Sequence, residues 1–284
     1  MSTSTFAPLF VSHGSPMTAL QPGAAGAFWR QLGAALQRRR PRAILALSAH
    51  TLAREPLLLA GERQHAVYDF GGFDPELYTL RYDAPGAPGL AAELLQRLGN
   101  ARVRALPEAG LDHGIWTVLR FMFPDAEVPV LPMAWSPRAS PAELFQLGQD
   151  LAPLAEEGVL IIGSGSITHN LRRVFAQGMP PIDAPEIRES AEFRAWMLAR
   201  SAARDWDALL DYRQQAPHAV DMHPTDEHLL PWFIAAGAGG RLDAPQRLHD
   251  SLTYGCLGMD AYAFGPEAAA LAEELPIIAA ETRV

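Results

Sequence analysis

The sequence lacks the features that would place it outside a reducing compartment or within a membrane. A single cysteine, Cys256, is present among 284 residues, so no disulfide can close within the chain. No run reaches the roughly 18 apolar residues that a membrane-spanning helix needs. The first apolar run, residues 6–11, is too short for a signal peptide core and has no cationic residues before it. We therefore expect a cytoplasmic protein without membrane contact.

Positive charge is also scarce. Lys and Arg number 23 against 32 Asp and Glu, which gives a formal net charge of −9. This balance argues against a nucleic-acid partner, because nucleic acid requires a basic face, and against an anionic membrane surface. Hydrophobic residues make up 49% of the chain, which excludes a disordered protein. No repeat, low-complexity segment or linker marks a boundary, so we expect one domain over residues 1–284.

Several signatures of common enzyme classes are missing. There is no His-Glu-x-x-His helix, no cysteine pair with zinc spacing, no P-loop and no Gly-x-Gly-x-x-Gly after a strand. The segment Gly163-Ser164-Gly165-Ser166 departs from the Gly-x-Ser-x-Gly nucleophile pattern and gives a serine hydrolase little support. Cys256 is interpreted as a small buried hydrophobe rather than a catalytic thiol.

What the sequence does contain is a set of histidines placed after apolar runs. His13, His50 and His169 each follow a predicted strand, beside small residues or turn residues. In open α/β sheets the ligand crevice lies outside the carboxyl ends of the strands. Imidazoles gathered there predict a metal site, of a kind that suits Zn, Fe, Cu or Ni. The strands before these histidines are expected at residues 7–11, 43–49 and 159–162.

Two further histidines are predicted at the starts of helices. Asp112 is the expected N-cap of a helix that begins with His113. Thr225 is the expected N-cap of another helix, with Glu227 and His228 in its first turn, where a carboxylate complements the helix dipole. We expect no role in the site for the histidines at His65, His218 and His249.

The alternation of predicted strands and helices indicates an α/β fold. We expect a mixed or mostly parallel central sheet flanked by helices, with the active site at the carboxyl ends of the strands. Turn residues predict loops at 68–73 and 78–88, and the second loop is long enough to act as a lid. Further strands are expected at residues 57–60, 103–106, 128–134 and 251–257, and helices at residues 24–38, 90–98, 113–123, 141–155, 186–201, 205–212, 225–236 and 266–275.

Six motifs occur in a fixed order along the chain. They are His13-Gly14-Ser15-Pro16, Ser48-Ala49-His50, Asp69-Phe70-Gly71-Gly72-Phe73, Leu111-Asp112-His113-Gly114-Ile115-Trp116, Thr168-His169-Asn170-Leu171 and Pro224-Thr225-Asp226-Glu227-His228-Leu229-Leu230-Pro231. Together they resemble the DOPA-extradiol-dioxygenase-like branch of the class III (LigB-type) extradiol ring-cleavage dioxygenases. The resemblance covers about residues 8–258. No single motif is decisive, but six in register are specific.

The resemblance implies an α/β fold with one non-haem metal ion. On its motifs, the positions that match metal ligands are His13, His50 and His228. His169 matches the acid/base histidine, and His113 matches a second active-site histidine near the substrate.

This chain departs from the family pattern close to the third ligand. His223 stands where a residue such as Asn is expected, and Asp226 stands where Pro is common. Glu227 directly precedes His228, so a carboxylate ligand stays an alternative, as does a contribution from His223.

The activity that the resemblance implies is extradiol cleavage of a catecholic aromatic ring with O2. Fe(II) would serve for activity, or Zn(II) would be the ion bound. Phe73, Tyr78 and Trp116 are candidates to line the substrate pocket. The alternative is a zinc-bound hydrolase, or a binding protein of the same fold, because redox-inert zinc cannot activate O2. The sequence leaves the particular catechol, the native metal and any oligomer open.

Overall fold

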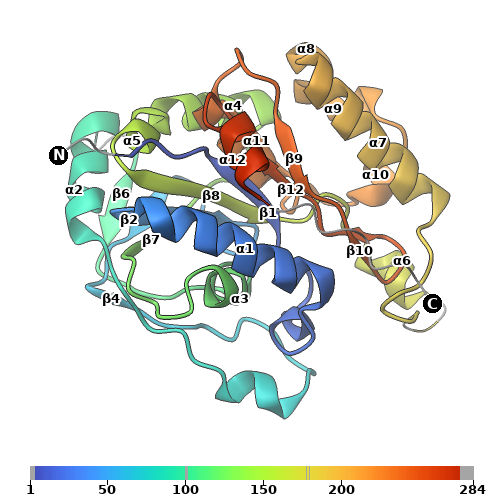
Figure 1. Cartoon of the computed structure of the whole chain (residues 1–284), viewed down its shortest axis with the longest axis horizontal. Helices are drawn as coiled ribbons and strands as arrows, with labels where there is room; N and C mark the ends of the chain where they lie inside the picture. Colours follow the sequence, from blue (N-terminus) through green and yellow to red (C-terminus); the bar gives the residue numbers. More distant parts are fainter. Residues whose placement is uncertain (1–3, 100–101, 177, 179, 276–284) are drawn as a thin grey trace.

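A central sheet organises the molecule, and the computed structural model describes residues 4–99, 102–176, 178 and 180–275 of it (Figure 1). Within these ranges the eight strands of the sheet are β1 (Leu9–Ser12), β2 (Ala43–Ser48), β3 (Leu57–Leu59), β6 (Arg104–Leu106), β7 (Val130–Ala134), β8 (Val159–Gly165), β9 (Gln246–His249) and β12 (Ala261–Ala263). Their order is β6-β3-β7-β2-β8-β1-β12-β9. The four strands β7, β2, β8 and β1 are parallel, whereas β3 and β12 run antiparallel to their neighbours β7 and β1. The expected mixed, mostly parallel sheet is confirmed.

The pairing register brings the ends of three strands to one level. Strand β8 lies between β1 and β2, and Ser12 of β1 is paired with Gly165 of β8. Ser48 of β2 is paired with the preceding residue, Ser164. Because parallel strands end at the same edge of a sheet, the residues that follow β1 and β2 leave the sheet side by side.

Helices cover both faces of the sheet (Figure 1). They are α1 (Gly23–Arg39), α2 (Pro88–Leu98), α3 (His113–Met122), α4 (Pro141–Leu151), α5 (Pro153–Glu156), α6 (Leu171–Phe175), α7 (Arg188–Ala203), α8 (Trp206–Leu210), α9 (Tyr212–Gln215), α10 (Ala219–Met222), α11 (Leu230–Gly239) and α12 (Ala268–Glu274), with the 3-10 helices η1 (Pro16–Ala19) and η2 (Pro75–Thr79). No helix in the described part of the chain is long and apolar enough to cross a membrane.

The two faces of the sheet have separate hydrophobic layers. Ile44 of β2 packs in the layer of α1 and α3, and the next residue, Leu45, packs in the layer of α4 and α11. This alternation follows from the two-residue period of a strand. Helices α4 and α11 approach closely, because a Cβ at Gly148 would lie only 2.1 Å from the carbonyl oxygen of Ile234. The glycine therefore allows α11, which follows the His228 segment, to pack tightly.

Most predicted elements are present, but the C-terminal part differs. The predicted strand over residues 251–257 is wrong: β10 (Leu252–Thr253) and β11 (Leu257–Gly258) form a hairpin. Its connection contains Tyr254 and Gly255 at positive φ, which no strand continues through. Strands β9 and β12 were not predicted, because β12 has only three residues and shows no length of alternation.

Two boundaries follow local chemistry. The helix predicted over residues 141–155 divides into α4 and α5 at Pro153, which has no amide hydrogen to continue the α4 ladder. Ser140 caps α4 as expected, in a capping box with Glu143. The antiparallel pair of β4 (Arg63–Gln64) and β5 (Ala84–Pro85) encloses the predicted loop at residues 68–73, and β5 falls within the predicted loop at residues 78–88.

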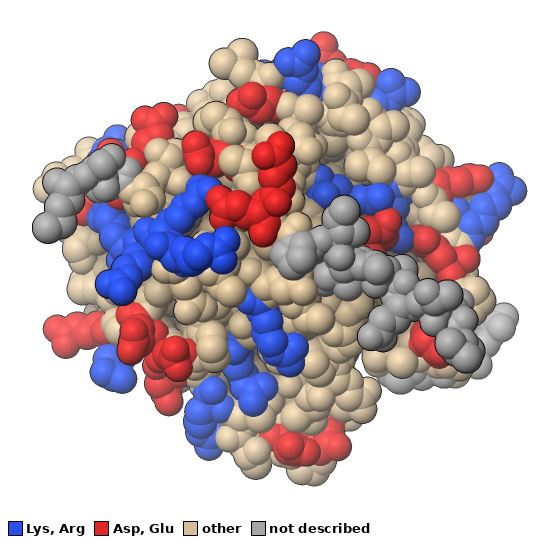
Figure 2. Space-filling model, viewed as in Figure 1, with Lys and Arg blue, Asp and Glu red and all other residues tan. Residues whose placement is uncertain are grey.

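Acidic and basic side chains are interspersed on the face that carries α1 (Figure 2). Arg39 of α1 pairs with Glu267 and Glu274, which lie at the two ends of α12. These partly exposed pairs connect the two helices, although each contributes little to stability because water and salt screen it.

Candidate metal centre

The first two site histidines are fixed by the backbone at the end of the sheet. His13 directly follows β1, and its amide donates to the carbonyl of Gly165 at 2.9 Å. His50 follows β2 by two residues, and its amide donates to the hydroxyl of Ser48 at 3.2 Å. The Nε2 atoms of His13 and His50 lie 3.1 Å apart. The strand-end placement expected from the sequence therefore brings these two imidazoles into contact.

Three more imidazoles close the cluster. The ring centroid of His228 lies 5.5 Å from that of His13 and 4.9 Å from that of His50. The ring of His113 lies 5.4 Å from His13 and 4.1 Å from His50. His169 stacks on His228 at 3.5 Å with the planes only 8° apart. All five histidines that the sequence singled out are thus brought together.

The spacing fits a shared metal ion. Two nitrogens bound to the same tetrahedral zinc ion, each at about 2.0–2.1 Å, stand roughly 3.3 Å apart. The separation between the Nε2 atoms of His13 and His50 is close to this value. Within the described ranges, the side chains of His13, His50 and His113 bring one ligand atom each within 4.8 Å of one another. A second group with the same spacing contains His169, Glu227 and His228. The imidazole-rich donor set fits a transition metal better than Ca²⁺ or Mg²⁺.

Hydrogen bonds decide which nitrogen of His13 is free. The hydroxyl of Ser164 donates to the carbonyl of Gly114 at 2.5 Å, because a carbonyl can only accept. The same oxygen lies 3.0 Å from His13 Nδ1 and must accept there. His13 therefore carries its hydrogen on Nδ1 and leaves the Nε2 lone pair for a ligand, as metal-binding histidines commonly do.

Two carboxylates lie beside the Nδ1 atoms of other rings, as the Ser164 hydroxyl does for His13. Glu227 Oε1 lies 3.2 Å from His228 Nδ1 and also accepts from Thr225 at 3.0 Å. Asp69 Oδ2 lies 3.0 Å from His113 Nδ1. Burial raises the pKa of Asp69, but the hydrogen bonds from His113 outweigh this and hold the pKa below its usual range, so the carboxylate is ionised.

Four of the clustered rings, those of His13, His50, His169 and His228, are neutral at pH 7 in the absence of a metal. Burial, followed by the neighbouring imidazoles, lowers the pKa of His13 and of His228 well below the usual value. The same causes lower the pKa of His50 to about 4 and that of His169 to about 2. Because a metal binds the neutral imidazole, no proton has to leave these four rings at pH 7 before an ion enters.

The predicted position of His228 in a helix is wrong. Helix α11 begins at Leu230, two residues after His228, and Thr225 is not its N-cap. His228 lies in a turn instead, and its carbonyl accepts from the amide of Ser166 at 2.8 Å. A Cβ at Gly165 would lie 2.0 Å from that carbonyl oxygen, so the glycine at the end of β8 is what lets the turn approach the sheet.

Asp112 occupies the N-cap position of α3 but does not cap it through its side chain. Its buried carboxylate accepts instead from the hydroxyls of Ser48, at 2.7 Å, and Thr51. The first amide of the helix, that of His113, donates to Asp69 at 2.9 Å. A residue from a remote loop thus performs the capping that the sequence assigned to Asp112.

The predicted aromatic lining reaches the cluster only indirectly. Trp116 is fully buried, and its indole N–H donates to the carbonyl of Val67 at 3.0 Å. Phe73 and Tyr78 contact Phe70, with ring centroids 5.6 and 5.4 Å away. Phe70 in turn contacts the ring of His113, a member of the cluster, with ring centroids 5.7 Å apart. Asp69 and Phe70 stand in a motif that the sequence had marked, but neither was predicted as a site residue.

His223 and His218 belong to neither of the two metal-ligand groups. His223 is fully buried beside Phe193; its Nε2 lies 3.0 Å from the carbonyl of Ile167. Its Nδ1 has no partner among the residues described. His218 pairs with Glu192.

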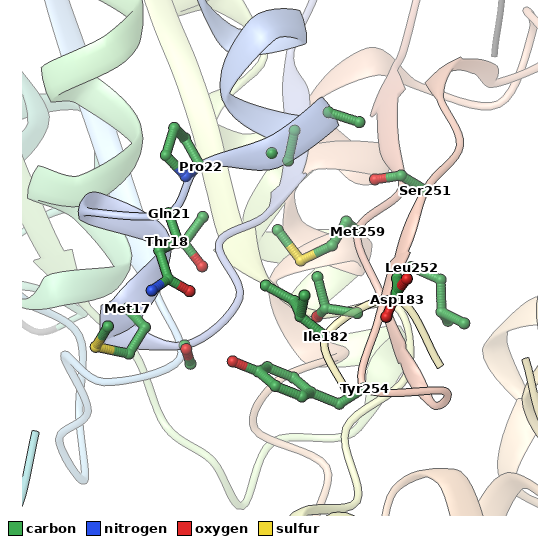
Figure 3. Close-up of a pocket in the computed structure, with 15 residues that line it drawn as sticks. Met17, Thr18, Gln21, Pro22, Ile182, Asp183, Ser251, Leu252, Tyr254 and Met259 are labelled. Carbon is green, nitrogen blue, oxygen red and sulfur yellow. The ribbon is translucent and has the colours of Figure 1, made fainter. Parts of the chain in front are cut away.

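A cavity of about 190 Å³ adjoins the segment that follows His13, and Ser15 is one of the residues that line it (Figure 3). Its wall includes Met17 and Thr18 from one side and Met259 and Tyr254 from the other. A Cβ at Gly14 would lie 2.6 Å from the Thr18 hydroxyl and 3.0 Å from Met259, so this wall packs directly on that segment. None of the five clustered histidines lines this cavity.

The chain is similar to known proteins over most of its length. The chain is 34% identical over 262 residues to a 4,5-DOPA dioxygenase extradiol of Beta vulgaris, covering 90% of this chain and 95% of that protein. It is 35% identical over 242 residues to the 4,5-DOPA dioxygenase extradiol of Escherichia coli strain K12, covering 84% and 87%. The crystal structure of an uncharacterized protein from Escherichia coli K12 superposes with a TM-score of 0.74 at 28% identity, over 92% of this chain and all of the other.

A family model covers nearly the whole described fold. Residues 7–265 match the model of the catalytic LigB subunit of aromatic ring-opening dioxygenase. This range contains all five clustered histidines and the carboxylates Asp69 and Glu227. The chain therefore belongs to the LigB family of aromatic ring-opening dioxygenases.

Proposed function

We propose that this chain is an extradiol dioxygenase that opens the ring of a small catechol with O2, as a single catalytic domain. The observation that carries the proposal is the gathering of five imidazoles at the carboxyl ends of β1, β2 and β8, with two Nε2 atoms 3.1 Å apart. A metal needs three such ligands, so the cluster contains histidines left over for chemistry. The two relatives named above, both 4,5-DOPA dioxygenases by name, support the same reaction class.

We assign the metal to His13, His50 and His228. All three rings lie within 5.5 Å of one another, and His13 and His228 each have Nδ1 beside an acceptor, which leaves Nε2 for the ion. Bound Fe(II) would supply positive charge that favours an ionised catechol, together with the electrons for O2 chemistry. Glu227 then serves as the partner of His228 Nδ1 rather than as a ligand.

His169 is assigned as the acid/base residue. Its ring stacks on His228, and its amide donates to the carbonyl of Met222 at 2.9 Å, which holds the backbone of His169 in place beside the ligands. Burial keeps this ring neutral in the metal-free site, so a ring nitrogen has a lone pair free. We assign to it the proton of a catechol hydroxyl, which bound Fe(II) would acidify, and the later return of that proton. His113 is the second histidine that faces the substrate, with Phe70 beside it.

The rival is a zinc protein of the same fold that hydrolyses or only binds its ligand. A neutral histidine set binds Zn(II) as well as Fe(II), so the donor set alone does not choose between them. Of the two forms, only the iron form can couple catechol binding to O2 consumption. O2 consumption therefore distinguishes the dioxygenase from the zinc protein.

The test loads the metal-free protein anaerobically with Fe(II) or with Zn(II) and measures O2 consumption on a panel of catechols. We expect the iron form to consume O2 and produce a yellow ring-opened semialdehyde, and the zinc form to consume none. Because an imidazole acid/base contributes on the order of 10²–10⁴-fold, His169→Ala should retain metal and slow turnover by about that factor. The matched control is His65→Ala, since His65 is exposed and outside the cluster. An inactive iron form, together with hydrolysis by the zinc form, would support the rival.

A further inference from the structure

The carboxylate of Asp69 contacts both the backbone amide and the ring of His113. Asp69 Oδ1 accepts the His113 amide at 2.9 Å, and Asp69 Oδ2 lies 3.0 Å from His113 Nδ1. Asp69 belongs to the loop between β4 and η2, 44 residues before His113 in the sequence. Because one oxygen holds the backbone and the other holds the ring, the carboxylate restrains the ring relative to its own backbone.

The chemistry of this pair settles which ring nitrogen bears the hydrogen. An ionised carboxylate can only accept hydrogen bonds, so Nδ1 must donate to it. A neutral imidazole has one N–H, and Nε2 is then left with its lone pair. The next residue, Phe70, packs edge-on against the same ring with the planes at 88°, which restrains the ring from rotating.

We propose that Asp69 is a positioning residue for His113, which it holds in the Nδ1–H tautomer so that Nε2 presents a lone pair to a substrate hydroxyl. The identity of that hydroxyl, one of the two on a catechol, rests on the proposed function. A hydroxyl donates one hydrogen, and Nε2 in this tautomer accepts it. In the opposite tautomer Nε2 would carry a hydrogen and could not accept the hydroxyl, so the substrate would lose one orienting contact.

Asp69→Asn is a sharp test because the amide has one acceptor and one donor end. The His113 backbone N–H cannot lose its hydrogen, so the amide oxygen must face it. The amide NH2 then faces Nδ1, which has to become an acceptor, and the hydrogen moves to Nε2. Asp69→Glu keeps two acceptors and should keep the original tautomer. The matched control is Asp74→Asn, in the same segment, where the carboxylate caps the amide of Glu76 at 2.9 Å and touches no histidine.

The first measurement is the two-bond ¹⁵N–¹H spectrum of ¹⁵N-histidine-labelled, metal-free protein, with His113→Gln to assign the signals. We expect the Nδ1–H pattern for His113 in the wild type, in Asp74→Asn and in Asp69→Glu, and the Nε2–H pattern in Asp69→Asn. An Nε2–H pattern in the wild type, or no change in Asp69→Asn, overturns the proposal. If Asp69→Asn does not fold, the wild-type pattern and that of Asp69→Glu still decide it.

The second measurement is steady-state kinetics of the iron-loaded enzyme on a catechol that it cleaves. Loss of a residue that orients a site group typically costs 10–100-fold, so Asp69→Asn should lower kcat by about that factor with unchanged iron content, and Asp69→Glu should recover part of it. A flipped tautomer with unchanged kcat overturns the proposed role of the Nε2 lone pair. If the wild type cleaves no catechol, the proposed function fails, and the spectrum alone still decides the role of Asp69.

Discussion

The hydroxyl of Ser164 connects His13 to the first turn of α3. Its oxygen lies 3.0 Å from His13 Nδ1 and donates to the carbonyl of Gly114 at 2.5 Å. Ser164 stands on β8, so one side chain ties together β1, β8 and the helix that carries His113. All these groups are buried, and removing the hydroxyl would leave His13 Nδ1 without this acceptor.

Ser164→Ala should therefore weaken metal binding. Without its acceptor, His13 Nδ1 no longer has to carry the hydrogen, and the ring loses its fixed orientation. Such partners typically contribute 10–100-fold in metal affinity, which competition with a chelator for Zn(II) can measure. Ser166→Ala is the matched control, because Ser166 is equally buried at the same strand end but its hydroxyl donates to the carbonyl of Thr168. Equal affinities for the two variants would contradict the role of Ser164.

The identity of the third ligand can be decided between His228 and His113. We expect His228→Ala to lose most of its metal and His113→Ala to retain it, as measured by metal analysis after dialysis. The alternative is real, because His113 forms the more compact group with His13 and His50. Metal loss in His113→Ala alone would reverse the assignment. Glu227→Gln should keep the metal at lower affinity, since its side chain would still accept from His228.

Gly165→Ala should destabilise the fold and disturb the site. A Cβ there would lie 2.0 Å from the carbonyl oxygen of His228, and the neighbouring group is backbone that cannot rotate away. Overpacking of this kind costs about 1–3 kcal/mol or more in the free energy of unfolding, which urea denaturation measures. Gly71→Ala is the control, because no atom lies within 4 Å of the added Cβ and its φ is not positive. If Gly165→Ala is as stable as Gly71→Ala and binds the metal with full affinity, the turn at His228 tolerates displacement.

The sequence predicts the parts of the site that depend on strand order. His13, His50 and His169 were predictable because an apolar run followed by a turn fixes where a strand ends, and parallel strands end at one edge. The position of His228 in a helix was wrong because Thr225 followed by acidic residues is a cap pattern, whereas tertiary contacts placed a turn there.

The partners of the imidazoles were not predictable in the same way. Asp69 contacts His113 across 44 residues, and Ser164 contacts His13 across 151. No local period or propensity reports such contacts, because they exist only once the sheet has assembled. Asp112 is a further example. Its position matches a local N-cap pattern, but its carboxylate binds Ser48, 64 residues away.

The metal-free protein should lose stability on acidification, and His223 should account for one share of the loss. Burial lowers the pKa of His223 from 6.5 to about 4. Above pH 6.5 both folded and unfolded states are neutral at this ring. Between pH 6.5 and 4 only the unfolded state gains the proton, so the free energy of unfolding falls as the pH falls. At pH 5 this one group should cost about 2 kcal/mol relative to pH 7.5. Urea denaturation at both pH values should show a smaller loss in His223→Asn than in the wild type, with His65→Asn, at an exposed ring, as the control. An equal loss in all three proteins would mean that the His223 ring is accessible to protons in the folded state.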